Sequence, residues 1–367
     1  MRERILALTR ELMLLPGLSG HEGRVRQRLR AELQALGLAP RTDRLGNLVA
    51  TLPGDPSAPS VMLFAHMDQL GFIVRKIERD GLIRVERLGG VPERALAAQP
   101  VLLCVEDGRD VVGVIGNKSH HATGADEKYR VVPYPDVAID VGLDDASAVR
   151  AAGIDVGTPV VYQPAFRQLG AERIAGTAVD DRAGCAVLVE VVRALVGAPP
   201  AATVHIVFAV QEEFNLRGVM PAARTLAPDI AIQIDLVLAT DTPDMASRGD
   251  VALGGGPAMS LYSFHGRGTL NGTLPHPALV RLHESTAATI GATLQRSAHV
   301  GALTETAYVQ LIGAGVATVD LGFPMRYSHS ANEVCDVRDL ADLARLLVAA
   351  IGRIGPEFSL DPDDRYP

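Results

Sequence analysis

The chain has 367 residues, of which 47% are hydrophobic and 21% charged, and its formal net charge is -8. This length predicts one large domain accompanied by a smaller one. The acidic balance and the lack of a basic stripe argue against a nucleic-acid partner, because phosphate binding requires clustered positive charge. The three cysteines are odd in number and far apart. They indicate neither a disulfide framework nor a thiolate metal site, and they favour a reducing compartment.

The amino-terminal segment predicts an amphipathic helix rather than a secretion signal. Apolar residues recur at helical spacing from Ile5 to Leu15, and arginines and glutamates interrupt them. A second helix is expected over residues 25–36, and strands over residues 47–52 and 61–65. No uncharged apolar run is long enough to span a bilayer. We therefore expect a cytoplasmic protein with no membrane partner.

The middle of the chain changes to short apolar runs separated by polar turns. Strands are expected over residues 72–77, 83–88, 101–105, 111–115 and 160–162, with one helix over residues 146–152 and a mobile polar loop over residues 117–130. This pattern is typical of a small β-barrel or sandwich. We predict that residues 70–165 form a β-rich domain inserted into a domain made of residues 1–69 and 166–367.

Strands and helices alternate again in the last part of the chain. Helices are expected over residues 181–196, 219–226, 277–290, 306–312 and 336–354, and strands over residues 204–210, 230–239 and 316–321. Such alternation predicts an α/β fold with a mixed, largely parallel sheet flanked by helices. Ligands of such sheets bind at the carboxyl ends of the strands.

Acidic and imidazole side chains stand at several of these predicted strand ends. His66 follows a buried strand, and Asp68 lies two residues further on. A carboxylate can orient the free ring N–H of a metal-binding imidazole, so this pair is either a ligand with its orienting group or a hydrogen-bonded turn. Asp180 and Asp181 stand where coil enters a helix. One of them can be explained as an N-cap, and the other would suit a carboxylate that bridges two cations.

Glu212 and Glu213 give the strongest single signal. They follow the apolar run at residues 204–210, where two adjacent carboxylates repel each other and lose solvation unless a cation lies nearby or a pKa is raised. Because neighbours on a strand point to opposite sides, we expect one to be a metal ligand and the other a general base.

The remaining candidates are single residues. Asp235 is an acid inside an otherwise apolar strand, where an unpaired carboxylate is costly. Asp241, at the end of the same strand, is its rival as a ligand, although a turn cap would also explain it. His329 is either a last metal ligand or a plain loop histidine. Taken together, these segments indicate one site for divalent cations.

This set of motifs resembles the M42 family of metallo-aminopeptidases, the glutamyl and deblocking aminopeptidases that form tetrahedral particles. The resemblance covers nearly the whole chain, and its motifs lie at residues 65–68 with Gly71, 176–182, 211–213 with 216–218, 234–235, 239–243 and 326–330. It implies a zinc-peptidase-like α/β catalytic domain interrupted by a β-rich dimerisation domain. It also implies a homo-oligomer in which dimers assemble into a dodecamer.

The resemblance assigns a role to each candidate. It implies two divalent metal ions, with Zn²⁺ expected and Co²⁺ or Mn²⁺ as alternatives. The implied ligands are His66 and Asp235 for one ion, Glu213 and His329 for the other, and Asp180 bridging both. Glu212 is implied as the general base that activates a water held between the ions, and Asp68 as the catalytic residue that orients His66.

The expected reaction is hydrolysis of the amino-terminal residue from a peptide. One departure concerns the substrate side: where the family usually carries a Gly-Thr-Asp-Ala segment lining the substrate pocket, this chain has Leu-Thr-Glu-Thr-Ala, with Glu305 as the longer acid. The alternative is therefore a metal-dependent amidohydrolase or deacylase acting on small N-acyl or amide metabolites.

Overall fold

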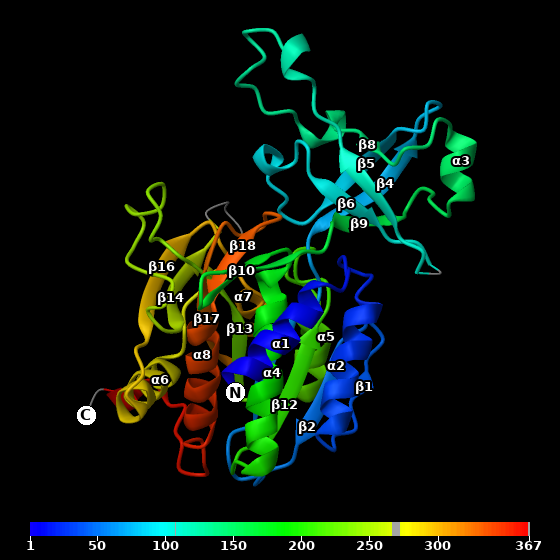
Figure 1. Cartoon of the computed structure of the whole chain (residues 1–367). Coiled ribbons are helices and arrows are strands. Elements are labelled where there is room, and N and C mark those ends of the chain that lie inside the picture. The colour runs from blue at the N-terminus through cyan, green and yellow to red at the C-terminus, as the bar shows by residue number, and fades with distance from the viewer. Residues whose placement is uncertain (107, 266–271, 366–367) are drawn as a thin grey trace.

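The computed structural model describes residues 1–106, 108–265 and 272–365, which form an α/β domain and a β-barrel (Figure 1). The chain leaves the α/β domain after β3 (Val61–His66), forms the barrel, and returns to the large sheet with β10 (Phe166–Leu169). The barrel lies beyond one end of the α/β domain, at the upper right of Figure 1. The predicted mixed α/β fold with an inserted β-rich unit is confirmed.

The large sheet has twelve strands in the described residues. Besides β3 and β10 they are β1 (Arg41–Thr42), β2 (Leu48–Leu52), β11 (Arg173–Gly176), β12 (Val204–Ala209), β13 (Ile230–Leu238), β14 (Ala258–Phe264), β15 (Gly272–Thr273), β16 (Gln295–Val300), β17 (Ala317–Arg326) and β18 (Glu333–Asp336). The main path runs β1-β2-β12-β3-β13-β17-β18-β11-β10. The pairs β12–β3, β3–β13 and β13–β17 are parallel, and the pairs outside them on this path are antiparallel.

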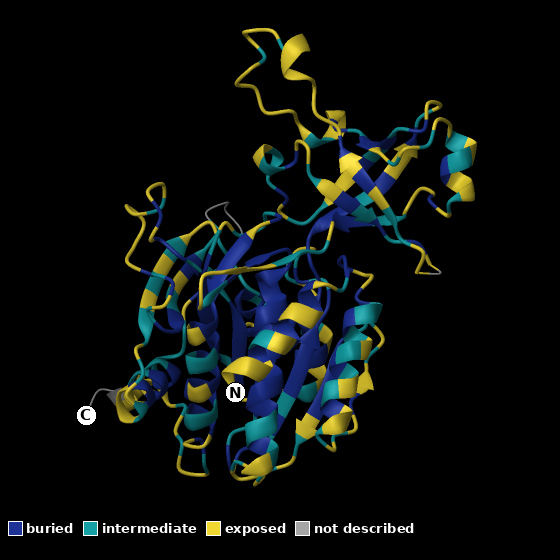
Figure 2. Cartoon of the chain, viewed as in Figure 1, coloured by how far each residue is buried: buried dark blue, intermediate teal, exposed yellow. Residues whose placement is uncertain are grey.

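Helices cover both faces of this sheet. In the α/β domain they are α1 (Arg2–Met13), α2 (Gly23–Ala35), α4 (Val179–Gly197), α5 (Val219–Leu226), α6 (Pro277–Ile290), α7 (Thr306–Val309) and α8 (Val337–Ile351), with a 3-10 turn at Pro362–Arg365. One face packs against α1, α2, α4, α6 and α8, and the other against α5 and α7. Figure 2 shows the resulting buried centre between exposed helix surfaces.

The sequence of β3 explains how one strand serves both cores. Successive side chains of a strand point to opposite faces of its sheet. Val61, Leu63 and Ala65 therefore join the core under α4, while Met62 and Phe64 join the core under α5 and α7. A strand buried on both faces reads as a continuous apolar run, which is why the central strands were predictable.

The helix ends follow their local sequence. The side chain of Asp336 accepts a hydrogen bond from the backbone N–H of Arg338 and caps α8, and Pro277 stands in the first turn of α6. Gly291 ends α6 in the left-handed conformation, with φ of 65°. In β17, a Cβ at Gly322 would lie 2.1 Å from the carbonyl oxygen of Asp235, so glycine allows β17 to pack closely beside β13.

Some elements differ from their predicted extent. Strands β10, β11, β14, β16 and β18 were not predicted. They are short, polar or at the edge of the sheet, and β16 alternates between intermediate and exposed residues, so they lack a continuous apolar run. Strand β17 continues to Arg326, beyond the predicted end at residue 321. The prediction ended too early because Gly322 and Pro324 interrupt the usual strand pattern. Helix α7 is shorter than predicted and ends at Val309.

The inserted unit is a closed barrel of six strands in its described part. They are β4 (Gly71–Ile77), β5 (Ile83–Leu88), β6 (Pro100–Leu103), β7 (Val111–Ile115), β8 (Ile139–Asp140) and β9 (Pro159–Tyr162), with helix α3 (Ala146–Ala151) and 3-10 turns at Glu93–Ala95, His120–Ala122 and Tyr134–Asp136. The polar segment between β7 and β8 projects away from both units, at the top of Figure 2, and is mostly exposed. Its predicted mobility stays a prediction.

The barrel also touches the α/β domain. Ala331, in the loop between β17 and β18, belongs to the barrel's core cluster together with Tyr162. The inserted unit therefore packs against the loop that carries His329. None of the helices in the described parts of the chain combines the length and the apolar character that crossing a lipid bilayer requires.

Candidate metal centre

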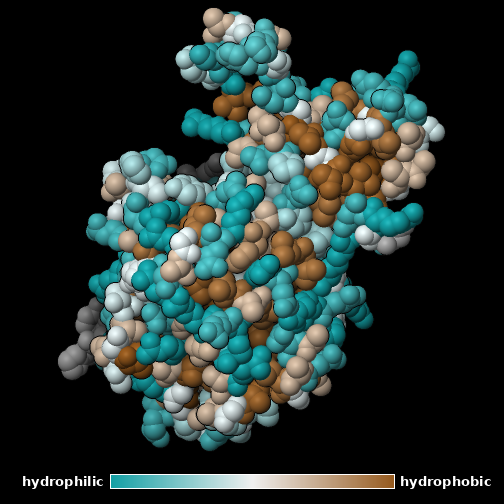
Figure 3. Space-filling view, in the orientation of Figure 1, coloured by the Kyte–Doolittle hydropathy of each residue, from teal (hydrophilic) through white to brown (hydrophobic). Residues whose placement is uncertain are grey.

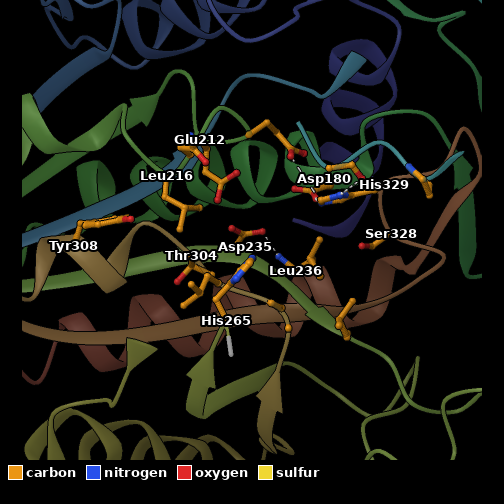
Figure 4. A pocket seen from close by; sticks show the side chains of 18 residues that line it. Asp180, Glu212, Leu216, Asp235, Leu236, His265, Thr304, Tyr308, Ser328 and His329 are labelled. Carbon is orange, nitrogen blue, oxygen red and sulfur yellow. Dashed lines mark hydrogen bonds and ion pairs between the residues drawn. The ribbon is translucent and has the colours of Figure 1, made fainter. Parts of the chain in front are cut away.

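The sequence-predicted site residues converge at the carboxyl edge of the central parallel strands. They are His66 at the end of β3, Glu212 and Glu213 after β12, Asp235 in β13, His329 after β17, and Asp180 at the start of α4. Figure 4 shows Asp180, Glu212, Asp235 and His329 around one cavity. Segments far apart in the sequence are brought together because parallel strands end at the same edge of a sheet.

We call His66, Asp180 and Asp235 the inner group, and all three are buried. Their potential ligand atoms lie within 4.8 Å of one another, and the Nε2 atom of His66 is 2.9 Å from Oδ1 of Asp180. The Nδ1 atom of His66 is 3.2 Å from the backbone oxygen of Asp68, which can only accept a hydrogen bond. Nδ1 therefore carries the proton of the neutral ring, and Nε2 is left free to bind a cation.

We call Asp180, Glu213 and His329 the outer group, and their ligand atoms also lie within 4.8 Å of one another. The Nε2 atom of His329 is 3.6 Å from Oδ2 of Asp180 and 3.8 Å from Oε2 of Glu213. Its Nδ1 atom donates to the backbone oxygen of Gly90 at 3.0 Å, so again Nε2 faces the carboxylates. The side chain of His329 is 34% exposed, which makes this group more open than the inner one.

Asp180 belongs to both groups. Its Oδ1 faces His66 and its Oδ2 faces His329, the arrangement that a bridging carboxylate needs. Its neighbour Asp181, across a cis peptide bond, points elsewhere and accepts hydrogen bonds from the backbone N–H groups of His66 and Gly184. The acceptance from Gly184, three residues on, is the capping role that the sequence allowed for one of the two aspartates.

Glu212 stands beside the inner group without belonging to it. Its Oε2 is 3.9 Å from Nε2 of His66, and its side chain lines the cavity. The expectation that Glu212 and Glu213 diverge by strand alternation was wrong in its reasoning, because β12 ends at Ala209. Gln211 has a φ of 55°, and this left-handed turn carries both glutamates out of the strand.

Asp68 acts mainly on the backbone of that turn. Its carboxylate is fully buried and accepts hydrogen bonds from the N–H groups of Glu212 at 3.0 Å and Glu213 at 3.1 Å, and from the hydroxyl of Ser19 at 2.5 Å. Toward His66 the carboxylate is 3.5 Å from Nδ1, whereas the backbone oxygen is closer. The carboxylate of Asp68 thus chiefly holds the backbone of Glu212 and Glu213, and its predicted role in orienting His66 stays a prediction.

The electrostatics are those of a cluster that lacks positive charge. Burial, together with the Asp180 carboxylate, raises the pKa of Asp235 to about 8. Burial raises the pKa of Glu213 to about 7, although His329 opposes that shift. Burial would lower the pKa of His329, but Glu213 and Asp180 outweigh it and raise the pKa to about 9. The cluster therefore retains protons that divalent cations would displace.

The donor set suits two divalent ions. Each group offers one imidazole nitrogen and two carboxylate oxygens, and zinc and related cations bind these donors. Each imidazole has its other nitrogen held by a backbone carbonyl, the usual arrangement around metal-binding histidines. The residues present therefore fit a dinuclear metal centre.

The two groups open into a cavity of about 600 Å³. Carboxylates and His329 line part of it, and Figure 4 shows apolar side chains close to them, with Leu216 beside Glu212 and Leu236 beside Asp235. The lining also includes Leu238, Leu303 and the ring of Tyr308, together with the polar His265 and Thr304. This combination can hold an apolar side chain next to a reacting amide.

Two residues lie outside this arrangement. The expectation that Glu305 faces the substrate was wrong: its side chain is fully buried and its Oε1 accepts a hydrogen bond from the N–H of Val219 at 2.7 Å. The backbone turns into α7 at this point, so that Thr304 lines the cavity while Glu305 points toward α5.

Asp241, the rival of Asp235, pairs with Arg326 at 2.6 Å and belongs to neither group.

The sequence reasoning missed two groups at the site. Glu333 is 2% exposed and accepts hydrogen bonds from the backbone N–H groups of Asp180 and His329. It opens a strand of four residues in which only Val334 and Cys335 are apolar, so the signal that identified Asp235, an acid inside a long apolar run, is missing at Glu333. The carbonyl of Gly90, which holds His329, has no sequence signature because every residue has a backbone carbonyl.

Comparisons with known proteins agree with this geometry. The model of the M42 glutamyl aminopeptidase family matches residues 46–346. The relative SgcX of Escherichia coli (strain K12) is 39% identical, over 94% of this chain and 93% of that protein. The solved structure of aminopeptidase APDkam598 from the archaeon Desulfurococcus kamchatkensis has a TM-score of 0.92 at 32% identity, covering 98% of this chain and 97% of that one.

A further solved structure is that of the TET1 peptidase of Pyrococcus horikoshii, described as assembling into a tetrahedron or a large octahedral shell. It has a TM-score of 0.85 at 26% identity and covers 95% of this chain and 100% of that one. The family match spans well over half of the sequence, and the predicted resemblance is confirmed. On the strength of its fold, its site and these likenesses, the chain belongs to the M42 glutamyl aminopeptidase family.

Proposed function

We propose that this protein is a dinuclear metal-dependent aminopeptidase that removes the amino-terminal residue from peptides. The observation that carries the proposal is the pair of ligand groups that share Asp180, with Glu212 beside them in the lining of the cavity. Two divalent ions bound there, Zn²⁺ or else Co²⁺ or Mn²⁺, would acidify a water and polarise the scissile carbonyl.

The chain's own residues provide the proton transfers. Glu212 lies within reach of the inner group, where it can accept a proton from the attacking water and return it to the leaving nitrogen. Asp68 fixes the position of Glu212 through the hydrogen bond to its N–H group. The proposed roles of His66, Asp180, Glu213, Asp235 and His329 are those of metal ligands.

The shape of the cavity supports a substrate with a free amino group and an uncharged first side chain. Carboxylates of the site attract a positively charged amino terminus, and the leucines and Tyr308 offer an apolar surface to the side chain. Among the described lining residues no lysine or arginine occurs that would pair with an acidic side chain. We therefore expect leucyl substrates to be cleaved faster than glutamyl ones.

A panel of substrates tests this proposal. Leucyl, lysyl and glutamyl arylamides, dipeptides, N-acetyl-leucyl arylamide and N-acyl amino acids would be assayed with Zn²⁺, Co²⁺ or Mn²⁺. Metal-dependent cleavage is expected only where the amino terminus is free. Faster hydrolysis of the N-acyl compounds would instead support the amidohydrolase alternative. That alternative was motivated by Glu305, which is buried and does not line the cavity.

We further propose that the chain forms a homo-oligomer through its inserted domain. Figure 3 shows an apolar patch on the barrel surface, and the barrel's large exposed apolar residues include Val112, Val114 and Val156. Assembly into dodecamers is supported by the likeness to a solved TET1 structure described as a dodecamer, with a TM-score of 0.83 at 27% identity. Light scattering would test the proposed oligomer, and a monomer at all concentrations would contradict it.

The predicted cytoplasmic location stays a prediction.

A further inference from the structure

Glu333 connects the two segments that carry the shared and the outer ligand candidates. Its Oε2 accepts a hydrogen bond from the backbone N–H of Asp180 at 3.1 Å, and its Oε1 accepts one from the N–H of His329 at 2.7 Å. Asp180 and Glu333 are 153 residues apart in the sequence. One buried carboxylate therefore joins two segments that local sequence does not hold together.

The position of Glu333 in the sheet explains how it reaches both. It is the first residue of β18, which lies between β17 and β11, and it pairs directly with Gly176 of β11. The chain leaves β11 toward Asp180 and leaves β17 toward His329. Glu333 thus lies between the carboxyl ends of β11 and β17, on a strand that is hydrogen-bonded to both.

Neither segment is held in place by regular structure at the ligand itself. His329 lies in a loop with a φ of 67°, and Asp180 has non-helical backbone angles at the start of α4. Hydrogen bonds from backbone N–H groups to a carboxylate are among the stronger ones in proteins. Such bonds fix the backbone from which each ligand side chain projects, and with it the direction of the side chain.

We propose that Glu333 is a positioning residue that sets the distance between Asp180 and His329 and so adapts the outer group to its metal ion. The inference rests on the proposed function, since it takes these residues as metal ligands. Glu333 would do for Asp180 and His329 what Asp68 does for Glu212 and Glu213, which are also held through paired N–H groups. Two buried carboxylates, Asp68 and Glu333, would then hold the backbone of four residues of the proposed centre.

Substitution of Glu333 by glutamine is the sharpest change, because the side chain keeps its size. A glutamine has one acceptor oxygen, and its amide nitrogen can only donate, so one of the two N–H groups loses its acceptor. Glu333→Ala removes both acceptors. The chain offers a matched control in Asp339, a buried carboxylate at the start of α8 that accepts hydrogen bonds from the N–H groups of Gly254 and Gly256, away from the cavity.

The experiment measures metal affinity and backbone protection in the full-length wild type, Glu333→Gln, Glu333→Ala and Asp339→Asn proteins. Zn²⁺ and Mn²⁺ affinities would be measured by calorimetric titration against a competing chelator. Both Glu333 variants are expected to bind the more weakly held ion roughly 10–100-fold less tightly, the usual effect of losing a residue that supports metal ligands. Asp339→Asn should bind both ions as the wild type does.

Hydrogen exchange of the metal-free proteins gives a second readout that does not depend on ions or activity. Segments containing Asp180 and His329 should exchange faster in Glu333→Ala than in the wild type or in Asp339→Asn. Unchanged exchange at both segments would overturn the inference, as would unchanged affinity for both ions in Glu333→Gln. An equal loss of metal affinity in Asp339→Asn would show that the loss in the Glu333 variants comes from general destabilisation. That result would also overturn the inference. If the wild type itself binds no ion, the proposed function fails, and the inference fails with it.

Discussion

The inner and outer groups of the candidate metal centre share Asp180 but are built differently. In the inner group, His66 and Asp235 belong to two central strands and are buried. In the outer group, Glu213 and His329 lie in loops, and the side chain of His329 is 34% exposed. Ordering a loop residue costs conformational free energy that a strand residue has already lost on folding. The comparison teaches that two sites with the same donor types need not hold their ions equally well.

Removal of the shared ligand should have the largest effect. Asp180→Ala deletes one oxygen from each group, so we expect both ions to be lost together. Loss of the several kcal/mol that metal ions contribute to the transition state corresponds to roughly a 10³-fold lower kcat/KM. Metal content by mass spectrometry and turnover of a leucyl arylamide measure this. Retention of one full equivalent of metal would show that the groups are independent and would break the comparison.

Loss of the base should separate catalysis from metal binding. Glu212 belongs to neither group, so Glu212→Gln is expected to keep both ions and to lower kcat by about 10²–10⁴-fold, the usual contribution of a general base. The neighbouring change Glu213→Gln serves as the control and should release an ion from the outer group. Full activity in Glu212→Gln would show that the base has been assigned to the wrong residue.

Chelation and pH should distinguish the two groups by a smaller factor. We expect a chelator to remove the outer ion first, with affinities that differ by about tenfold, since ordering one residue costs on the order of 1–2 kcal/mol. Metal affinity should rise with pH, by about tenfold per pH unit for each displaced proton, until His329 loses its proton near its pKa of about 9. Simultaneous release of both ions at every pH would argue for a single cooperative site.

The metal-free protein should show the opposite trend in stability. The pKa of His329 is about 9 in the folded state against 6.5 ordinarily, so its stabilising contribution is present below pH 6.5 and is lost as pH rises through about 9. Glu213 and Asp235 have pKa values raised to about 7 and about 8, and they too favour the folded state less as they ionise. Calorimetric Tm values should therefore fall between pH 6 and 9 without metal, and a flat or rising profile would contradict this.

The smallest effect is expected at Asp241. It pairs with Arg326 at the sheet edge near the site, yet it faces neither group. Asp241→Asn should leave metal content and kcat unchanged and should cost about 1 kcal/mol or less of unfolding free energy, as is usual for ion pairs near the surface. Denaturant unfolding and metal analysis would check both parts. A lost ion would show that Asp241, and not Asp235, supplies the inner ligand.

The same comparison shows what the sequence could and could not reveal. The central strands were predictable because burial on both faces produces unbroken apolar runs, in which the acid Asp235 stands out. The ligand candidates follow such runs and were found by their chemistry. Strands β14, β16 and β18 were not, because short or half-exposed edge strands carry no such pattern.

Contacts made by the backbone were also beyond the reach of sequence patterns. Every residue has a carbonyl like that of Gly90, and every residue except proline has an N–H group like those held by Asp68 and Glu333. The sequence identified Glu305 as an unusual acid, but it could not show where the side chain points. That direction depends on how α7 packs against α5. Chemistry could therefore be predicted from residue types, whereas orientation required the fold.

The order of the strands has a consequence for the way in which a newly made chain becomes able to bind metal. His66 and Asp180 are 114 residues apart, and the whole barrel is synthesised between them. The outer group also needs His329, so an amino-terminal fragment must reach residue 329 before it contains the donors of both groups. Ions that bind only the finished fold shift the folding equilibrium toward it by mass action. Metal supply would then decide how much of the completed protein escapes degradation.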